Sequence, residues 1–283
     1  MTSPTPSPIR LADRIASVFG WKSGCIPNTE LAAVQINSSW VALPHLSYGF
    51  WPPHLQNQQL PWKQLLSPGV QWRWTGEEKS FKTASWLYLN RYKPKTALLK
   101  KLGQIKQDAF RLELGGQALL QTFWLVYAKR LHELGSLPLP QAFFSALLDG
   151  FQEGHAEIFV LYHEDKPVGA AYNLAIGGFY ENAWFATLKK YQGLGTSYFM
   201  HEKMIEHAKT AGFEIYSFGR STTGEGVHQF KRQWGTVDVP LAWYQDGLKK
   251  EGKWLLAKTA PLIRLLPFSL VVFLGKLTAK FIY

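Results

Sequence analysis

The stretch Gly178–Trp234 decides the fold, with the sequence GFYENAWFATLKKYQGLGTSYFMHEKMIEHAKTAGFEIYSFGRSTTGEGVHQFKRQW. Its first part, residues 179–188, is rich in aromatic residues and is typical of a strand. A glycine turn follows at 190–195, and apolar residues then recur over 196–210 at the spacing of one helix face. Residues 213–218 predict another strand. The order strand, glycine turn, helix, strand predicts a βαβ unit.

Gly212 stands where a helix commonly ends, and residues 219–226 predict a second glycine-rich loop. The first turn, Lys190-Tyr-Gln-Gly-Leu-Gly195, would present free backbone N–H groups at the positive end of a helix dipole, which suits an anion such as a pyrophosphate. The residues predicted to bind that anion are Lys190, Gln192, Gly193, Leu194, Gly195 and Thr196.

Composition indicates a globular protein with an ample core. The chain has 283 residues, of which 46% are hydrophobic and 18% charged, and its twelve Trp fit a packed core plus a surface that binds flat groups. A lone cysteine, Cys25, excludes a disulfide framework and a thiolate metal site, so we expect a reducing compartment and predict no metal. The start lacks the apolar segment of a secretory signal, and residues 1–10 are predicted to be a disordered lead.

The formal net charge of +11 favours an anionic partner: tRNA, a nucleotide-linked sugar, CoA or an acidic membrane face. The alternative is a basic soluble protein without such a partner. No Arg/Lys-rich helix and no RNA-module motif is visible, which weakens the case for a dedicated nucleic-acid groove, and we expect no binding to DNA.

Outside the opening stretch, patterning predicts helices and strands in the first half, followed by a β-hairpin. The helices are expected at 11–20, 96–110, 117–134 and 141–150, and the strands at 31–37, 40–43, 70–74, 85–89, 157–163, 168–176 and 237–244. The helix at 96–110 carries Lys100, Lys101 and Lys106, either as a binding face or as a solvated one.

The C-terminal segment 254–283 is apolar, and its charges are Lys258, Arg264, Lys276 and Lys280. Its uncharged part is far shorter than the roughly 20 residues of a spanning helix, and we expect Pro261 and Pro267 to break it. Two interpretations remain: a cationic amphipathic segment in an anionic membrane interface, or a helix docked on the domain.

Several motifs together resemble the FemAB-like family of GNAT-type acyltransferases, in the branch associated with exosortase and exopolysaccharide loci. Phe218-Gly-Arg-Ser-Thr-Thr-Gly-Glu-Gly226, followed by Phe230-Lys-Arg-Gln-Trp-Gly235, is similar to the most specific pattern of that branch. Phe123–Pro138, Leu99–Lys106 and Leu43-Pro…Ser47-Tyr-Gly49 resemble further family segments. The turn Lys190-x-x-Gly193-x-Gly195 resembles the GNAT signature, with Lys in place of Arg or Gln.

The resemblance implies an α/β (α+β) fold of two tandem GNAT-like halves, with mixed central sheets flanked by helices. The expected divisions are a degenerate half at 11–135, a catalytic half at 136–250 and the tail at 251–283. The implied reaction is acyl transfer to an amine of a cell-envelope glycan, lipid or peptide precursor, in the cytoplasm or peripherally at the inner face of the plasma membrane. The implied co-substrate is acyl-CoA, with aminoacyl-tRNA as the alternative and no permanently bound cofactor.

Amine attack on an ester or thioester needs an oxyanion donor and a proton acceptor. The resemblance assigns Lys231 to charge stabilisation, and Arg220, placed after a strand, could clamp a phosphate or carboxylate. Glu181 is a candidate general base and Tyr180 a candidate proton donor. Residues expected to line the substrate site are Ser47, Tyr48, Tyr172, Ser221, His228 and Phe230.

Each of these residues also has a purely structural interpretation: a solvated lysine, a loop-fixing ion pair, a tight turn or a packed histidine. The motif His201-Glu-Lys-Met-Ile-Glu-His207 lacks the metalloprotease spacing, so we interpret it as a helix surface. A catalytically inactive scaffold that docks on a membrane through its tail is therefore a further alternative, although the glycine turn, Arg220 and Lys231 argue against it.

Overall fold

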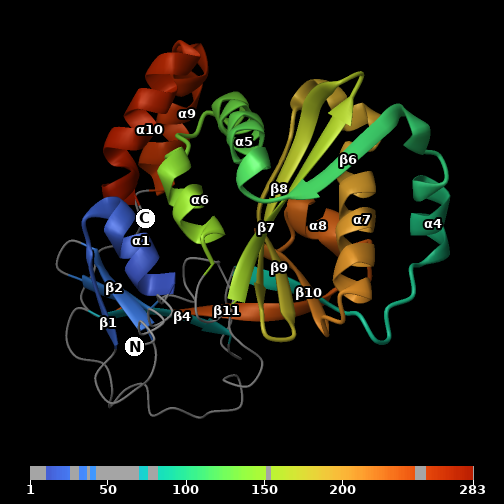
Figure 1. Ribbon diagram of the computed structural model, residues 1–283, viewed down its shortest axis with the longest axis horizontal. Helices are drawn as coiled ribbons and strands as arrows, with labels where there is room; N and C mark the ends of the chain where they lie inside the picture. The colour runs from blue at the N-terminus through green and yellow to red at the C-terminus, as the bar shows by residue number, and fades with distance from the viewer. Residues whose placement is uncertain are drawn as a thin grey trace, which may run out of the picture.

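The computed structural model describes residues 11–25, 32–36, 39–42, 70–75, 82–150, 154–245 and 253–282. Within these ranges a single mixed sheet crosses the molecule in the order β1-β2-β3-β4-β11-β5-β10-β9-β8-β7-β6 (Figure 1). The strands are β1 (Lys22–Cys25), β2 (Ala32–Ile36), β3 (Ser39–Ala42), β4 (Val70–Thr75), β5 (Lys82–Tyr88), β6 (Phe110–Gly115), β7 (Gly154–His163), β8 (Lys166–Ile176), β9 (Phe179–Thr187), β10 (Ile215–Thr222) and β11 (Val237–Gln245).

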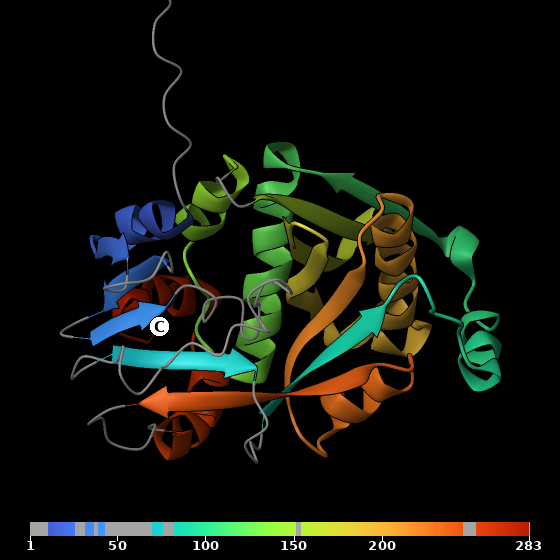
Figure 2. The same ribbon diagram turned by 90° about the horizontal axis from the view of Figure 1, so that it is seen from below.

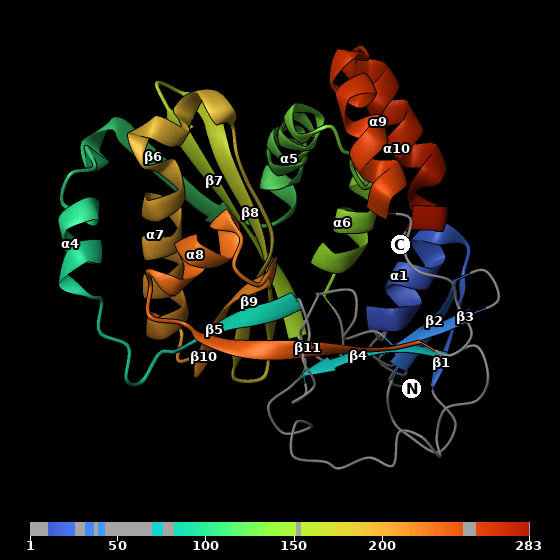
Figure 3. The same ribbon diagram turned by 180° about the vertical axis from the view of Figure 1, so that it is seen from behind.

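Helices cover both faces of the sheet. They are α1 (Leu11–Phe19), α4 (Thr96–Leu102), α5 (Leu120–Leu134), α6 (Gln141–Leu148), α7 (Thr196–Thr210), α8 (Gly226–Arg232), α9 (Lys253–Leu265) and α10 (Phe268–Ile282). α1, α5 and α6 lie on one side of the sheet, and α4, α7 and α8 lie on the other (Figures 1 and 3). The predicted fold class, a mixed sheet flanked by helices, is confirmed.

The long strand β11 joins the N-terminal strands to the rest of the sheet, as Figure 2 shows. Its residues 237–240 pair with β5 and its residues 241–245 pair with β4, both antiparallel. The expected division at 135/136 falls between α5 and α6, while β6, on the N-terminal side of it, pairs along its whole length with β7. The sheet is therefore continuous across that division.

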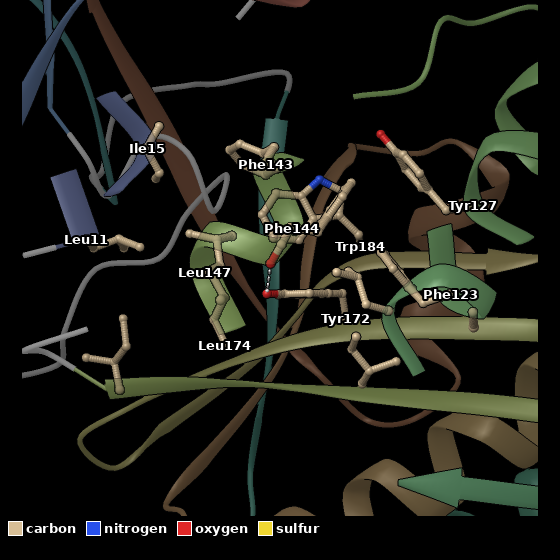
Figure 4. Close-up of a cluster of buried hydrophobic side chains, with 14 of the residues drawn as sticks. Leu11, Ile15, Phe123, Tyr127, Phe143, Phe144, Leu147, Tyr172, Leu174 and Trp184 are labelled. Atoms are coloured by element: carbon tan, nitrogen blue, oxygen red, sulfur yellow. Dashed lines mark hydrogen bonds between the residues drawn. The ribbon is translucent and has the colours of Figure 1, made fainter. Parts of the chain in front are cut away.

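A cluster of aromatic side chains fills the space between α5, α6 and the sheet (Figure 4). Phe123, Phe144, Tyr172 and Trp184 are buried and meet at centroid distances of 5.0–5.6 Å. The Tyr172 hydroxyl donates a hydrogen bond to the Phe144 carbonyl oxygen at 2.8 Å. Truncating one such ring to alanine typically costs about 3–5 kcal/mol, so this cluster contributes strongly to stability.

Two predicted boundaries are wrong. The helix expected over 96–110 ends at Leu102, and residues 110–115 form the strand β6, whose apolar Phe110, Leu112 and Leu114 alternate with polar residues at the period of a strand. The loop expected over 219–226 begins later, because Arg220, Ser221 and Thr222 still pair with β5.

In the C-terminal segment, Pro261 lies inside α9, which continues through it, because one proline removes one hydrogen bond and need not end a helix. Pro267 does separate α9 from α10. The helix over 196–210, its preceding strand and the β-hairpin were all correctly predicted.

Candidate active site

The strands β9 and β10 run parallel for only three residue pairs and then separate. The pairs are Ile215 with Phe179, Tyr216 with Tyr180 and Ser217 with Glu181. Beyond them the register of β10 against β5 shifts between Ser217 and Arg220. A shift of this kind bends the strand and redirects its side chains. We call the group Glu181, Ser217, Gly219, Arg220 and Lys231 the β9–β10 junction.

Gly219 lets β10 pass close to β9 at this point. Its φ of +68° lies in the left-handed region that favours glycine. A Cβ atom there would lie 3.2 Å from the Asn182 carbonyl oxygen and 3.6 Å from the Glu181 Oε1. The backbone at Gly219 therefore needs both the conformational freedom and the small size of glycine.

Lys231 reaches the junction from α8. Its side chain is only 6% exposed, and its Nζ donates hydrogen bonds to the carbonyl oxygens of Gly219 at 2.9 Å and Arg220 at 3.0 Å. His228, one helical turn earlier, is buried on the same face of α8. An ammonium group has three N–H donors, and these two carbonyls occupy two of them. One donor of Lys231 is left for a further acceptor.

Burial lowers the pKa of Lys231 from its ordinary value of 10.5 to about 7. The Glu181 carboxylate opposes this shift and the Arg220 guanidinium adds to it, so both charges act on the ammonium. Glu181 is itself fully buried in β9. A lysine with a pKa near neutrality can exchange its proton under ordinary conditions, which is common at functional sites.

The structure thus brings together three of the four predicted catalytic residues: Lys231, Arg220 and Glu181. Tyr180 lies in the core beneath α7, where its hydroxyl donates to Glu157 Oε2 at 2.7 Å. Burial, together with the Glu157 charge, raises the pKa of Tyr180 far above its ordinary value. His207 binds the same Glu157 oxygen at 2.9 Å. This arrangement gives Tyr180 a packing role.

His201 lies between the separated strands, and its placement on a helix surface was wrong. It is only 4% exposed, and its ring stacks on Phe185 of β9 at 4.5 Å and lies 4.6 Å from Phe218 of β10. Its Nδ1 is 2.9 Å from the Tyr216 hydroxyl. Burial lowers the pKa of His201 to about 3, so the ring is neutral at pH 7. Its position within the apolar stripe of α7, three residues before Met204, was the available signal.

The predicted anion-binding turn forms a short 3-10 helix, Lys189–Leu194, followed by Gly195 with φ +79° and then α7. Lys190, Gln192, Gly193 and Leu194 are exposed, whereas Thr196 is buried and its hydroxyl lies 3.4 Å from the Tyr191 carbonyl. The Ile105 side chain covers Gly195, where a Cβ would come within 2.8 Å of it. Gly193 has open space around it.

The expected substrate residues are scattered. His228 accepts from the Gly224 N–H and pairs with Asp238, each at 2.9 Å, so it fixes the loop before α8. Phe230 packs against Tyr198 and His201. Ser221 is buried in β10, next to Arg220, and Tyr172 belongs to the aromatic core. Ser47 and Tyr48 lie outside the described residues.

An open groove of about 460 Å³ lies between α4 and α8. We call it the α4–α8 groove, and it is lined by Lys95, Ala97, Leu98, Lys101, Gln229, Arg232 and Gln233. Three cations and no carboxylate line it. Lys101 donates to Gln233 Oε1 at 2.8 Å and thereby links α4 to the end of α8. The groove is therefore a positively charged surface on the outer side of the helix that carries Lys231.

In the part of the chain that the structure describes, no cluster of three or more His, Cys, Asp or Glu side chains is placed to hold a metal ion. Across the same ranges, no helix combines the length and the hydropathy that crossing a bilayer requires.

A sheet whose central strands separate beside a glycine turn, with a buried lysine at the fork, belongs to an acyltransferase-type α/β fold. The sequence profile described as "Acetyltransferase (GNAT) domain" matches residues 89–232, half of the chain. The chain therefore belongs to the GNAT acetyltransferase-domain family. No curated protein matches it closely enough to count as a relative.

Solved structures share this fold at low sequence identity. The C-terminal domain of a putative lysylphosphatidylglycerol synthetase from Agrobacterium fabrum has a TM-score of 0.56 and 11% identity, over 88% of this chain and 90% of that one. L-PGS from Bacillus licheniformis gives 0.55 and 12%, over 89% and 92%. FemX gives 0.56 and 10%, over 87% and 92%. These similarities extend the GNAT fold to most of the chain.

Proposed function

We propose that this protein transfers an acyl group from an activated donor to an amine, with Lys231 stabilising the developing oxyanion. The observation that carries the proposal is the geometry of Lys231. Two carbonyl oxygens of β10 hold its Nζ in place, and the third N–H remains for a substrate oxygen. A preorganised donor in a buried site is effective because it needs no reorganisation as charge develops.

In this mechanism the amine lone pair attacks the carbonyl carbon of the donor, and the carbonyl oxygen gains negative charge. Lys231 donates a hydrogen bond to that oxygen. The C–S or C–O bond to the leaving group then breaks, and the leaving thiolate or alkoxide takes up the proton that the amine gives up. The amine loses one proton, and we assign its acceptance to the buried Glu181 carboxylate of the junction, which passes it to the leaving group. No covalent enzyme intermediate is required.

Acyl-CoA is our first candidate donor. The exposed turn Lys189–Leu194 leads into α7. The backbone N–H groups in the first turn of α7, together with the helix dipole, attract an anion. Lys189 and Lys190 are exposed beside it. Thr187, next to the turn, is six strand residues from Glu181 in the junction, a distance of about 20 Å. A donor bound at the turn therefore needs a long thioester arm to reach Lys231.

An aminoacyl ester such as aminoacyl-tRNA is the second candidate, and one observation favours it. Phe185, His201 and Phe218 fill the space where β9 and β10 separate, which is the path that a thioester arm would follow from the turn to Lys231. A donor that approaches Lys231 from another direction leaves this cluster in place.

For either donor we propose an amine acceptor in a cell-envelope precursor, on the basis of the FemAB-like motifs around Arg220 and Lys231.

The first experiment measures the thermal stability of the purified protein with CoA, acyl-CoAs, aminoacyl-tRNA and UDP-sugars. A ligand that binds the native state raises the apparent stability with the logarithm of its concentration. Gly193→Phe is the informative variant, because no atom lies within 4 Å of the position of its Cβ. This variant should leave the unliganded protein as stable as the native chain and should prevent an anionic donor from binding at the turn.

A saturable acyl-CoA shift that Gly193→Phe abolishes would support the first donor. A thermal shift with aminoacyl-tRNA alone would favour aminoacyl-tRNA, the second candidate donor, over acyl-CoA. If no donor binds, and if Lys231→Met and Arg220→Gln both leave a complementing strain active, the protein is an inactive scaffold and the proposed function is wrong.

A further inference from the structure

The C-terminal helices α9 and α10 form a hairpin that, in the described part of the chain, packs on α5. The hairpin lies against α5 and projects away from the sheet, as Figures 1 and 3 both show. Two glycines make the contact close: a Cβ on Gly135 would come within 2.4 Å of the Ala260 carbonyl oxygen, and one on Gly275 within 2.4 Å of the Pro138 carbonyl oxygen. The tail therefore docks on the domain, as one of the two interpretations predicted, and the other interpretation concerns its outer face.

The inward and outward faces of α10 are chemically different. Val271, Gly275 and Ala279 recur every four residues and are buried. Leu270, Phe273 and Leu277 occupy the opposite side, and Phe273 and Leu277 are 57% and 51% exposed. α9 adds Leu262 and Leu265, which are 64% and 82% exposed, near the turn into α10. Apolar side chains thus form a row on the outer face of the hairpin.

Cations border this row. Lys276 and Lys280 follow Phe273 and Leu277 by three residues each, so they lie beside the apolar side chains on the exposed face. Arg264 of α9 lies on the docked side instead, where it donates to the Leu134 carbonyl oxygen of α5 at 3.2 Å. Residues 253–282 contain no Asp or Glu at all. An apolar row bordered by cations, without a single carboxylate, is complementary to an anionic lipid surface.

We propose that the outer face of the α9–α10 hairpin docks on an anionic phospholipid bilayer. Leu262, Leu265, Leu270, Phe273 and Leu277 enter the acyl boundary, while Lys276 and Lys280 stay at the level of the phosphates. The hairpin lies in the interface and does not cross it. The inference does not depend on the proposed reaction.

The test is co-sedimentation of the full chain with vesicles of phosphatidylcholine, alone and mixed with phosphatidylglycerol. We expect binding to the mixed vesicles. Lys276→Ala with Lys280→Ala should weaken it about 30-fold, since each lysine near an anionic surface contributes about fivefold. Phe273→Ser with Leu277→Ser should weaken it by about tenfold, because apolar area leaves the interface.

Matched controls exist on the far side of the sheet. Lys100→Ala with Lys106→Ala removes the same charge from exposed positions near α4, and Leu99→Ser with Leu114→Ser removes similarly exposed leucines. Both controls should bind like the native chain. Absence of binding, or equal loss in variants and controls, would overturn the proposal. A dimer that only the hairpin variants convert to monomer, without vesicle binding, would show that a second copy covers this face.

Discussion

The Lys231 ammonium donates a hydrogen bond of 2.9 Å to the carbonyl oxygen of Gly219, the residue at which β10 takes left-handed backbone. The lysine and the glycine are therefore one structural unit. The backbone conformation presents the carbonyl, and the carbonyl accepts from the ammonium and orients it. Substitutions at either residue should therefore affect the same reaction. A substitution of Lys231 acts by removing the ammonium group, whereas a substitution of Gly219 acts through backbone strain.

Replacing Lys231 should strongly reduce transfer without unfolding the protein. Lys231→Met removes the donor but keeps the volume of the buried stem, and we expect kcat/KM to fall by about 10²–10³, the usual effect of losing one oxyanion donor. Lys231→Arg keeps a charge but cannot reproduce a single tetrahedral donor, so a similar loss is expected. Steady-state kinetics together with circular dichroism would test this. A folded Lys231→Met variant with native kcat/KM would exclude the role.

The pKa of Lys231 also predicts how stability depends on pH. Because the pKa is about 7 in the folded chain and 10.5 ordinarily, the unfolded chain binds more protons between these values. The free energy of unfolding should therefore rise as pH increases from about 7 towards 10.5. Denaturant titrations of the native chain and Lys231→Met across this range isolate the contribution. If the difference in unfolding free energy between the two proteins does not change with pH, Lys231 titrates at its ordinary pKa.

Gly219 and Gly224 offer a matched pair of alanine substitutions. Both have positive φ, +68° and +85°, so each should lose about 1–2 kcal/mol of stability through backbone strain. Only at Gly219 does the new Cβ meet a backbone atom, the Asn182 carbonyl oxygen. Gly219→Ala should therefore be the less stable variant, and it alone should lower kcat through displacement of Lys231. Equal stability and equal activity in both variants would contradict this account.

The sequence predicted the central part of the fold because its signals are local. Strand, glycine turn and helix over 179–210 follow from alternation, glycine placement and an apolar stripe. The strand β6 was missed because its alternation covers only six residues and follows closely on the helix whose C-cap is Gly103. The place of β5 between β10 and β11 depends on contacts far apart in the chain, which local patterns do not encode.

The candidate site, like the fold, was predictable only where its signals are local in the sequence. The motifs around Arg220 and Lys231 identified two members of the junction, and the opening strand supplied Glu181. Patterns could not show that Tyr180 turns toward Glu157, because neighbouring residues of a strand point to opposite faces and the partner is 23 residues away. The burial of His201 between the separated strands depends equally on tertiary structure.

His201 and Tyr216 should show coupled energetics. Their contact, 2.9 Å between Nδ1 and the hydroxyl, is fully buried. His201→Phe leaves the tyrosine hydroxyl without its partner, Tyr216→Phe does the same to the imidazole, and each should cost about 1–3 kcal/mol. The double variant should cost less than the sum of the two. Denaturant unfolding of the four proteins measures this coupling, and strict additivity would contradict the contact.

The pKa of His201 gives this pair a pH dependence of the same sense as that of Lys231, in a lower pH range. Its value of about 3, against 6.5 ordinarily, means that the unfolded chain binds the extra proton between these values. The native chain should lose stability as pH falls from 6.5 towards 3, and His201→Phe should lose less. Unfolding curves at pH 7 and below would test it, and parallel losses in both proteins would assign the effect to other groups.

The α4–α8 groove should act on substrate capture and leave the chemical step unchanged. Lys95 is exposed at the groove, whereas Lys166 is exposed at the start of β8. Lys95→Glu reverses one of the charges with which, we propose, the groove attracts an anionic donor, so KM should rise by about tenfold at low salt while kcat stays constant. The increase should shrink at high salt, because exposed charges are screened. Lys166→Glu makes the same change in net charge and should leave KM near the native value. Equal effects of the two variants would mean that overall charge, not the groove, attracts the donor, and a fall in kcat for Lys95→Glu would place Lys95 in the chemical step.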